Sequence, residues 1–487
     1  MSGYGGRSCL SNNLLSQYFM KTFYVCLSLL ILLSCKKNVA HNSLPASGNF
    51  LINAGGKETE LVNNMDVDDN GNIYITGKSA YNTIGDSLFF GSSIVQSSGA
   101  EDIIVAKYDR QGNAIWARLV GSKSWDEGEA IAADEEGNCY VAGIFGAKIN
   151  FDKNLLTPQV IINNNGTPNH LDMFLAKYDQ QGKVNWVKQV SGVGYERPTA
   201  MQTDKAGNVV VTGYYRQKIN FGSTTLTAPG SALFIAKYAS NGNFLWAKSY
   251  GSNIHGDLYP TRLKFDNNEN IIITGSFENT HSIGGINIQS NGSQDVFTAK
   301  FDNSGTIQWV KAFGGSKIEN SNALAIDKSN NIYIGGLFKD VITTGGSAIT
   351  STANSSDAFF AKISANGNPE WLKHASGNGE ESVQDMFILN DTLYSLGYFT
   401  QNFKLDDYTM NNTGWYGFVS KHDLKGLPVG CIDMNLNSGT PKNIYLDASG
   451  YSVIAGYFSN TFSFDNMSSN AYGGFDLFLL KNRLSFK

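Results

Sequence analysis

The stretch Ile73-Tyr74-Ile75-Thr76-Gly77 is an apolar run that closes on a glycine, and it marks the unit from which the chain is built. Runs of this kind close on seven glycines, 59 to 70 residues apart, which we call the landmark glycines: Gly77, Gly143, Gly213, Gly275, Gly336, Gly397 and Gly456. A second run, such as Leu175-Ala176-Lys177-Tyr178-Asp179, follows each of them and contains a landmark lysine: Lys107, Lys177, Lys237, Lys300, Lys362, Lys421 or Lys481. Because both runs occur seven times in the same order, the chain is a sevenfold repeat.

Alternation and turn residues divide each unit into strands. Apolar and polar residues alternate inside the runs, which is the period of a β-strand and not that of a helix. Clusters of Asp, Asn and Gly, such as residues 68–72, precede the landmark runs and favour hairpin turns. A second turn, such as residues 109–113, leads from the lysine to a strand that carries a tryptophan in five copies: Trp116, Trp186, Trp246, Trp309 and Trp371.

Four strands in each of seven units predict an all-β fold, a seven-bladed β-propeller with four-stranded blades. A single unit cannot bury its own apolar face, and a closed ring protects the strand edges. The last unit lacks a fourth strand because only six residues follow Lys481. Residues 48–55 resemble a tryptophan strand. We therefore expect the N-terminal strand to complete the last blade.

These motifs resemble a known repeat. The pattern Asp-x-x-Gly-Asn-x-Tyr-x-x-Gly, followed by Phe-x-Ala-Lys-Tyr-Asp-x-x-Gly-x-x-x-Trp, is similar to the SBBP-type β-propeller repeat of bacterial, especially Bacteroidetes-like, envelope proteins. The resemblance covers residues 48–483 and implies the fold while saying little about activity. The last two copies depart from it, since Gly430 stands where a tryptophan is expected and Asn482-Arg483 replaces Tyr-Asp.

The N-terminal residues predict export to the cell envelope. Lys21 gives a positive start, and residues 23–33 form an apolar run that is shorter than the roughly 20 residues that span a bilayer. Such a run is typical of a signal peptide. The sequence Leu-Leu-Ser-Cys at residues 32–35 resembles a bacterial lipobox, which implies that Cys35 is lipidated and begins the mature protein. An ordinary secretory signal with a chance cysteine is the alternative.

The expected organisation is therefore a signal peptide, a tether and one propeller. The signal peptide comprises residues 1–35, with translation expected to start at Met20, the tether residues 36–47, and the propeller residues 48–487. One acyl chain holds a protein only marginally, so a stable anchor at Cys35 needs more than one chain. We expect a lipid-anchored protein of the bacterial outer membrane. The sequence leaves open whether it faces the periplasm or the outside.

The net charge and the cysteine content limit which binding partners and which disulfide bonds are expected. Loss of Arg7 and Lys21 with the signal peptide changes the formal net charge from −5 to −7, which argues against nucleic acid as a partner. Cys139 and Cys431 lie in different units and are expected to be small buried or half-buried residues and not a disulfide. We expect a monomer whose partners are the membrane, through the lipid anchor, and a protein or glycan ligand.

Residues that recur with the unit are expected to serve the fold. The five tryptophans suit packing between adjacent blades, and an aromatic cage for a ligand is the alternative. An acid stands five residues before most landmark lysines: Asp102, Asp172, Asp295, Asp357 and Asp476, with Ala232 and Tyr416 as exceptions. An acid and a lysine that recur on one strand suggest either a turn cap or a framework ion pair.

A second acidic series stands 17 residues before the landmark glycine: Glu60, Asp126, Glu196, Glu319 and Glu380, with Asp257 displaced by one residue. These positions fall in loops that join the outer strand of one blade to the inner strand of the next, around one mouth of the central channel. If the side chains point inward, they form a ring that attracts a hard cation such as Ca²⁺ or a polyhydroxyl ligand. Otherwise each carboxylate accepts N–H bonds from its own loop. No cofactor is otherwise expected, and the identity of any metal is unknown.

The same loops carry the candidates for ligand recognition. Aromatic and polar residues on loops of a rigid scaffold suit the binding of a protein or a glycan, although they also occur on ordinary surfaces. The candidate binding residues are Trp125, Asp126, Tyr195, Glu196, His255, Asp257, Tyr259, Glu319 and Glu380.

Motifs of catalysis are missing from the sequence. The six histidines lack metal-binding spacing, and no HExxH, GxSxG or phosphate-binding loop stands where the chemistry needs it. We therefore expect an envelope-anchored, non-catalytic β-propeller that binds a protein or glycan ligand through loops at one mouth. The alternatives are a glycan hydrolase or lyase that uses carboxylates at the channel mouth, and a purely structural envelope component.

Overall fold

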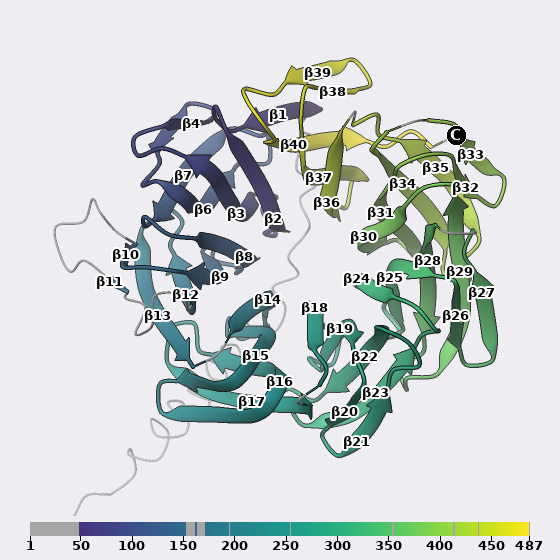
Figure 1. The fold of residues 1–487 in the computed structure, drawn as a ribbon. Coiled ribbons are helices and arrows are strands. Elements are labelled where there is room, and N and C mark those ends of the chain that lie inside the picture. Colours follow the sequence, from purple (N-terminus) through teal and green to yellow (C-terminus); the bar gives the residue numbers. More distant parts are fainter. Residues whose placement is uncertain are drawn as a thin grey trace, which may run out of the picture. The chain divides into compact units, whose positions relative to one another are not determined.

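Strands are the regular elements of the part of the chain described by this computed structural model, as the alternation predicts (Figure 1). The structure describes residues 48–486 apart from residues 152–160, 163–170, 194, 254, 353, 354, 413 and 437. The predicted signal peptide with Cys35 and the predicted tether lie outside the described residues. Within them, no helix has the length and apolar character needed to cross a membrane.

The first sheet shows how one repeat unit folds. Its antiparallel strands follow one another outward from the centre of the ring: β2 (Thr59–Val67), β3 (Ile73–Asn82), β6 (Ala100–Tyr108) and β7 (Ala114–Gly121). Gly77 lies in β3 and pairs with Ile104 of β6, so the two landmark runs lie side by side. A small hairpin of β4 (Ser87–Phe90) and β5 (Ser93–Gln96) occupies the variable stretch between them.

The same strand order recurs around the ring. Two further four-stranded sheets are β18 (Leu258–Phe265), β19 (Ile271–Phe277), β22 (Asp295–Phe301) and β23 (Ile307–Phe313), and β30 (Glu381–Leu389), β31 (Thr392–Phe399), β34 (Tyr416–Asp423) and β35 (Pro428–Asp433). A six-stranded sheet has the order β24 (Glu319–Ile326), β25 (Ile332–Lys339), β28 (Ser356–Ile363), β29 (Pro369–Gly377), β32 (Phe403–Leu405) and β33 (Tyr408–Met410).

An eight-stranded sheet contains two such meanders. They are β8 (Asp126–Ala133), β9 (Cys139–Phe145), β12 (Asp172–Tyr178) and β13 (Val184–Gly192), and β14 (Glu196–Thr203), β15 (Val209–Phe221), β16 (Thr224–Tyr238) and β17 (Phe244–Asn253). Small hairpins add β10 (Ile149–Asn150) with β11 (Ile161–Ile162), β20 (Thr280–Ile283) with β21 (Ile286–Gln289), β26 (Val341–Thr344) with β27 (Ser347–Thr350), and β38 (Thr461–Phe464) with β39 (Met467–Asn470).

The two ends of the propeller meet in one sheet. Its order is β36 (Gly439–Leu446), β37 (Tyr451–Phe458), β40 (Asp476–Arg483) and β1 (Phe50–Ala54). Phe50 lies opposite Lys481, and Ala54 lies opposite Leu477. The Nζ of Lys481 also donates to the carbonyl oxygen of Arg110 in the first sheet, at 3.2 Å. The chain is therefore an all-β β-propeller, and the prediction that the N-terminal strand joins the last sheet is confirmed.

The repeated tryptophans connect neighbouring sheets. Each indole covers the turn glycine of the next repeat unit: Trp116 on Gly182, Trp186 on Gly242, Trp246 on Gly305, Trp309 on Gly367 and Trp371 on Gly426. At Gly182 (φ 73°) an added Cβ would stand 2.5 Å from the indole of Trp116, so the turn needs a glycine both for its backbone and for its space. The Nε1 of Trp116 donates to the carbonyl oxygen of Gln180, at 3.0 Å. The expected packing role between blades is thus present.

Two junctions without a tryptophan use other aromatic residues. Phe50 and Ile52 of β1 lie against Gly112, where a preceding unit would place its tryptophan. Phe486 lies against Gly430 of β35, the position at which the repeat lost its tryptophan, and its ring centroid is 6.0 Å from that of Tyr394. Residues from the two ends of the chain therefore fill both positions.

The landmark lysines do not pair with the acid that precedes them by five residues. That acid lies at the other end of the same strand, roughly 16 Å away at about 3.3 Å per residue. Instead, four of them reach the aspartate of an inner hairpin turn: Lys177 to Asp134 (3.1 Å), Lys237 to Asp204 (2.8 Å), Lys300 to Asp266 (2.8 Å) and Lys481 to Asp447 (3.7 Å). Lys362 pairs with Glu370 at 2.8 Å, and Lys107 donates to the carbonyl oxygen of Gly137 at 3.0 Å. The suggested ion pair is therefore wrong, while the suggested turn cap agrees with the structure.

The apolar core lies between neighbouring sheets. One cluster joins Tyr74 and Ile103 of the first sheet to Val141 and Phe174 of the second, and equivalent clusters follow around the ring. Cys139 belongs to this cluster, and Cys431 is also buried, in agreement with the prediction.

Candidate functional site

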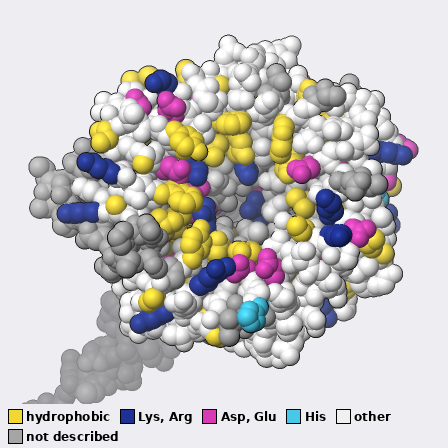
Figure 2. Space-filling model, viewed as in Figure 1, with side chains coloured by type: hydrophobic (Ala, Val, Ile, Leu, Met, Phe, Trp, Pro, Cys, Tyr) yellow, Lys and Arg dark blue, Asp and Glu magenta, His cyan; other side chains and the backbone are white. Residues whose placement is uncertain are grey.

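Exposed aromatic side chains stand at one end of the ring. Here the innermost strands begin and the outermost strands end, and we call this end the mouth; the opposite end, with the Asp-rich hairpins, is the turn end. Four aromatic side chains of the mouth loops are 37–42% exposed: Trp125, Tyr195, Trp415 and Phe475. Figure 2 shows hydrophobic side chains gathered around the centre of one face, with acidic and basic side chains between them.

A tyrosine directly after a landmark glycine contacts one of these aromatic residues at three places. The ring centroids are 5.9 Å apart for Tyr214 and Tyr195, 4.9 Å for Tyr398 and Trp415, and 5.5 Å for Tyr457 and Phe475. In the first sheet the same position holds Lys78, whose Nζ lies 5.3 Å from the ring centroid of Trp125. Such pairs hold the exposed rings in fixed orientations.

Tyr214, Tyr398 and Tyr457 were not among the residues predicted from the sequence. One sequence feature points to them: the residue directly after the landmark glycine differs from copy to copy, although it lies in a regular strand. The residues at this position are Lys78, Ile144, Tyr214, Ser276, Leu337, Tyr398 and Tyr457. Ile144 and Ser276 are buried at this position, whereas Lys78 and the three tyrosines are half-buried.

Charged side chains connect the aromatic residues of the first three repeat units. Lys78 Nζ lies 3.3 Å from Glu101 and 3.6 Å from Glu127. Arg197 contacts both Glu127, at 3.0 Å, and Glu129, and its Nη1 donates to the hydroxyl of Tyr195 at 3.3 Å. Burial, and then the charge of Glu127, raises the pKa of Glu129 to about 8.

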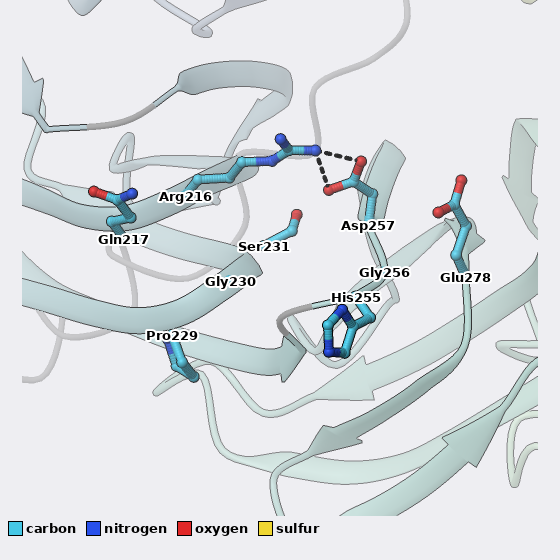
Figure 3. Close-up of a pocket in the computed structure, with 9 residues that line it drawn as sticks. All are labelled: Arg216, Gln217, Pro229, Gly230, Ser231, His255, Gly256, Asp257 and Glu278. Carbon is cyan, nitrogen blue, oxygen red and sulfur yellow. Dashed lines mark hydrogen bonds and ion pairs between the residues drawn. The ribbon is translucent and has the colours of Figure 1, made fainter.

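A pocket of about 360 Å³ opens at the mouth between β16 and β18. It is lined by Arg216, Gln217, Pro229, Gly230, Ser231, His255, Gly256, Asp257 and Glu278 (Figure 3). One nitrogen of Arg216, Nη2, contacts both oxygens of Asp257, at 2.7 and 2.6 Å. The hydroxyl of Tyr259 donates to the same carboxylate. Burial would raise the pKa of Asp257, but the hydrogen bonds from Arg216 and Tyr259 outweigh it and lower the pKa.

The structure brings Tyr195, Asp257 and Tyr259 close to one another. Tyr214 links them, because its ring centroid lies 5.1 Å from that of Tyr259 as well as next to Tyr195. His255 lies on the rim of the pocket and is exposed. Trp125 belongs to the neighbouring part of the mouth, around Lys78.

Most of the second acidic series is buried. Glu60, Asp126, Glu196 and Glu319 are at most 2% exposed. Three of these carboxylates accept a hydrogen bond from the backbone N–H of the residue four positions earlier. Glu60 accepts from Gly56 (2.7 Å), Asp126 from Ser122 (2.5 Å) and Glu319 from Gly315 (2.8 Å). These bonds agree with the interpretation in which each carboxylate accepts N–H groups of its own loop.

In the sixth copy the series is shifted by one residue. Glu381 pairs with Phe399, two residues after the landmark glycine, as Glu319 pairs with Phe338. Glu381 is therefore the buried equivalent, whereas Glu380 is exposed and its N–H donates to Thr400 at 2.7 Å. Among the described residues, no group of three or more His, Cys, Asp or Glu side chains is arranged to hold a metal ion.

Part of the first sheet matches a known repeat. Residues 51–80 match the SBBP family, described as a β-propeller repeat. This stretch contains the first landmark glycine and the strands on both sides of its turn. The predicted SBBP-type repeat is thus confirmed over these residues.

Two curated relatives are distant and much longer than this chain. An uncharacterized WD repeat-containing protein of Acanthamoeba polyphaga mimivirus is 24% identical over 85% of this chain and 36% of its own length. The regulatory protein FlaEY of Caulobacter vibrioides is 21% identical over 73% of this chain and 39% of its own length. The chain thus spans less than two fifths of each relative. A solved structure of YCF48 bound to D1 peptide is 9% identical and covers 91% of this chain and 97% of that chain, with a TM-score of 0.38.

Proposed function

We propose that this protein is a non-catalytic binding module of the bacterial cell envelope whose mouth binds a protein or glycan ligand. The observation that carries the proposal is the set of aromatic contacts at the mouth, where exposed rings are held by tyrosines or by Lys78. Rigid, exposed aromatic side chains offer a large contact area at a low cost in conformational entropy. They also stack on flat apolar faces of sugars and peptides.

The candidate residues have two roles in this proposal. Trp125, Tyr195 and Tyr259 supply the apolar contacts, the exposed His255 and Glu380 supply polar groups around them, and the half-buried Asp257 supplies a carboxylate in the pocket. The buried carboxylates Asp126, Glu196 and Glu319 support the loops instead of touching the ligand. The pocket at Asp257 has a volume of about 360 Å³, which suits one sugar ring or one amino-acid side chain. Arg216 and Tyr259 already hold the carboxylate of Asp257 in place.

The ring is proposed to contain seven four-stranded blades. The eight-stranded sheet divides at the β13–β15 link, where only Ser191 and Gly192 pair with Asn220 and Ile219. The six-stranded sheet divides where β29 meets β32, through Ser376 and Gly377 only. Removing these short links leaves seven meanders with one strand order, and the last of them includes β1.

One observation favours a second candidate, a glycan hydrolase or lyase. Glu127 and Glu129 both contact Arg197 at the mouth, and the pKa of Glu129, raised to about 8, would keep this side chain protonated at neutral pH. Glycoside hydrolysis uses two carboxyl groups, one of which is a general acid with a raised pKa. Hydrolysis of a bound glycan that is lost in Glu129→Gln would support this candidate over the binding module.

The position in the envelope rests on Cys35 and its lipobox-like sequence. Incorporation of a labelled fatty acid into the protein, and its loss in Cys35→Ala, tests the proposed lipid anchor. Release of that variant from the outer-membrane fraction tests the proposed location.

The binding proposal is tested with the full chain, whose binding is measured on a glycan array and to proteins of the outer-membrane fraction. Trp415→Ala and Tyr398→Ala remove one aromatic pair at the mouth. Leu427→Ala is the matched control, because Leu427 is 58% exposed and lies in the β34–β35 hairpin at the turn end. Retained binding in the Trp415 and Tyr398 variants would contradict the proposal.

A further inference from the structure

A β-bulge interrupts each innermost strand at the same place. In every unit, the residue that follows the partner of the landmark glycine has no partner in the register. These seven residues are all polar, and we call them the bulge ring: Asn63, Glu129, Thr199, Thr261, Asn322, Gln384 and Lys442. A bulge leaves its residue outside the hydrogen-bonded ladder and re-aims the side chain. Seven polar residues at one level of the innermost strands indicate a polar wall around the centre of the ring.

Arg262, directly after the bulge of β18, reaches across the centre of the ring. Its Nη2 donates to the carbonyl oxygen of Gln384 at 2.9 Å, and its Nη1 donates to the carbonyl oxygen of Thr261 at 3.1 Å. Thr261 belongs to the fourth unit and Gln384 to the sixth, so the half-buried side chain of Arg262 passes the fifth unit. A guanidinium has five N–H groups, so further donors remain for a ligand. Figure 2 shows Lys and Arg side chains inside the hollow at the centre of the face.

Lys442 differs from the other members of the bulge ring. Asn63 donates to the carbonyl oxygen of Gly128 at 2.9 Å, and Glu129 pairs with Arg197, so these side chains are held by the next unit. Within the described part of the chain, no ion pair includes Lys442. Its Nζ lies 5.7 Å from the ring centroid of Tyr457 instead. The half-buried ammonium group therefore keeps its N–H donors for a ligand.

Arg262 and Lys442 place an excess of positive charge in this part of the ring. Burial, and then the positive charge of Arg262, lowers the pKa of Lys442 to about 8. The acid that faces Arg262 is Asp385. Its Oδ1 accepts the N–H of Met386 at 2.9 Å and its Oδ2 accepts the N–H of Ile444 at 3.0 Å. Two cations and one carboxylate leave one positive charge that nothing among the described residues neutralises.

One excess positive charge suits one carboxylate group. The planar guanidinium matches the two oxygens of a carboxylate, and an ammonium group adds a charged donor beside it. Charge-assisted hydrogen bonds of this kind are stronger than neutral ones. A bound carboxylate would also end the repulsion between the two cations.

The aromatic residues of the mouth lie beside this pair of cations. Tyr457, which faces Lys442, also contacts Phe475 with 5.5 Å between the ring centroids, and Phe475 is 37% exposed. A uronic acid carries its carboxylate on the sugar ring itself. One such sugar can therefore pack its ring against an aromatic side chain while its carboxylate reaches a neighbouring cation.

We propose that Arg262 and Lys442 form an anion site that binds the carboxylate of an acidic sugar, so that the ligand of the mouth is an acidic glycan. The N–H groups of both side chains donate to the carboxylate oxygens, and the sugar ring packs on the aromatic residues of the mouth. This inference rests on the proposed binding role of the mouth and adds the chemical class of its ligand.

Titration of an oligosaccharide that contains glucuronate, and of its counterpart that contains glucose, into the full chain tests the anion site. At pH 7 the wild type should bind the acidic oligosaccharide about tenfold or more tightly than the neutral one. Lys442→Gln should lose most of this preference. Lys425→Gln is the matched control, because Lys425 is exposed in the β34–β35 hairpin at the turn end and its loss removes the same charge.

The pH dependence gives a second measurement. Because only the protonated form of Lys442 attracts a carboxylate, the preference of the wild type should fall as the pH rises from 7 to 9. Lys442→Gln should show no such fall. Its Tm should be no lower than that of the wild type, since the substitution removes a repulsion and no ion pair. Lys442→Met replaces Lys442→Gln if that variant does not fold.

The outcomes separate this inference from the proposed function. Equal affinity of the wild type for both oligosaccharides, binding of neither, or an unchanged preference in Lys442→Gln would overturn the anion site. Tighter binding of an acidic peptide than of the acidic oligosaccharide would overturn the assignment to a glycan. If Trp415→Ala weakens binding while Lys442→Gln keeps the full preference, the anion site is wrong and the binding role of the mouth stands.

Discussion

The turn end and the mouth of the ring are built from the same strands, yet they differ in how closely their residues repeat. At the turn end an aspartate such as Asp68 accepts the N–H groups of the residues two and four positions later, at 3.0 and 2.9 Å, and the same pair of bonds recurs at Asp204 and Asp327. At the mouth the corresponding strand ends carry Lys78, Tyr214 or Leu337. Contacts between units, such as those of the tryptophans with the turn glycines, therefore hold the residues of the turn end constant, whereas the residues at the mouth vary from copy to copy.

Deletion of residues 48–54 should produce the largest effect, because it removes all of β1. The last sheet would lose the strand that pairs with β40, and Leu477, Leu479 and Lys481 would lose their backbone partners. The ring should open between its first and last sheets. Limited proteolysis should then cleave the deleted protein much faster than the full chain, and unchanged resistance would show that β1 does not close the ring.

Trp116→Ala and Trp125→Ala compare the two ends directly. Trp116 is 4% exposed and packs on Gly182 at the turn end, so its loss should lower the free energy of unfolding by about 3–5 kcal/mol. Trp125 is 41% exposed at the mouth, and its loss should change the same quantity by less than about 1 kcal/mol. Denaturant unfolding measures both values. Equal losses would remove the distinction between the two ends.

Phe486→Ala should have an intermediate effect. The half-buried ring of Phe486 fills the position against Gly430 that a tryptophan occupies in other copies. Loss of a half-buried aromatic side chain should cost roughly 1–3 kcal/mol of unfolding free energy. The exposed neighbour Ser485 provides the control, as Ser485→Ala. A stability equal to that of the control would mean that the sixth copy of the repeat needs no replacement for its missing tryptophan.

The repeated part of the fold could be predicted from the sequence because each repeated residue has one task. Gly77, Lys107 and Trp116 mark three neighbouring strands, and their spacing alone predicts the meander. The role of Phe486 could not be predicted, because it follows the last copy by a few residues and fits no repeat position. The partner of each lysine was also missed, since a strand places Lys177 beside the turn of Asp134 and far from Asp172.

The candidate site could be predicted only in part. The mouth loops and Trp125, Tyr195 and Tyr259 were visible as aromatic residues in variable stretches, but Tyr398 and Tyr457 lie inside regular strands. A spacing counted from the landmark glycine also selected Glu380 in place of Glu381, because the turn of that copy differs by one residue. Burial separates these two adjacent glutamates, and spacing does not.

The measurement that tests the account most directly is the affinity of the mouth for the ligand that binds most tightly in the glycan and protein screens. Titration of that ligand into the wild type, Trp415→Ala and Leu427→Ala compares the mouth with the turn end in proteins of similar stability. We predict about a tenfold or greater loss of affinity in Trp415→Ala, equivalent to about 1.4 kcal/mol, and no change in Leu427→Ala. Equal affinities in all three proteins, or a loss only in Leu427→Ala, would contradict the account.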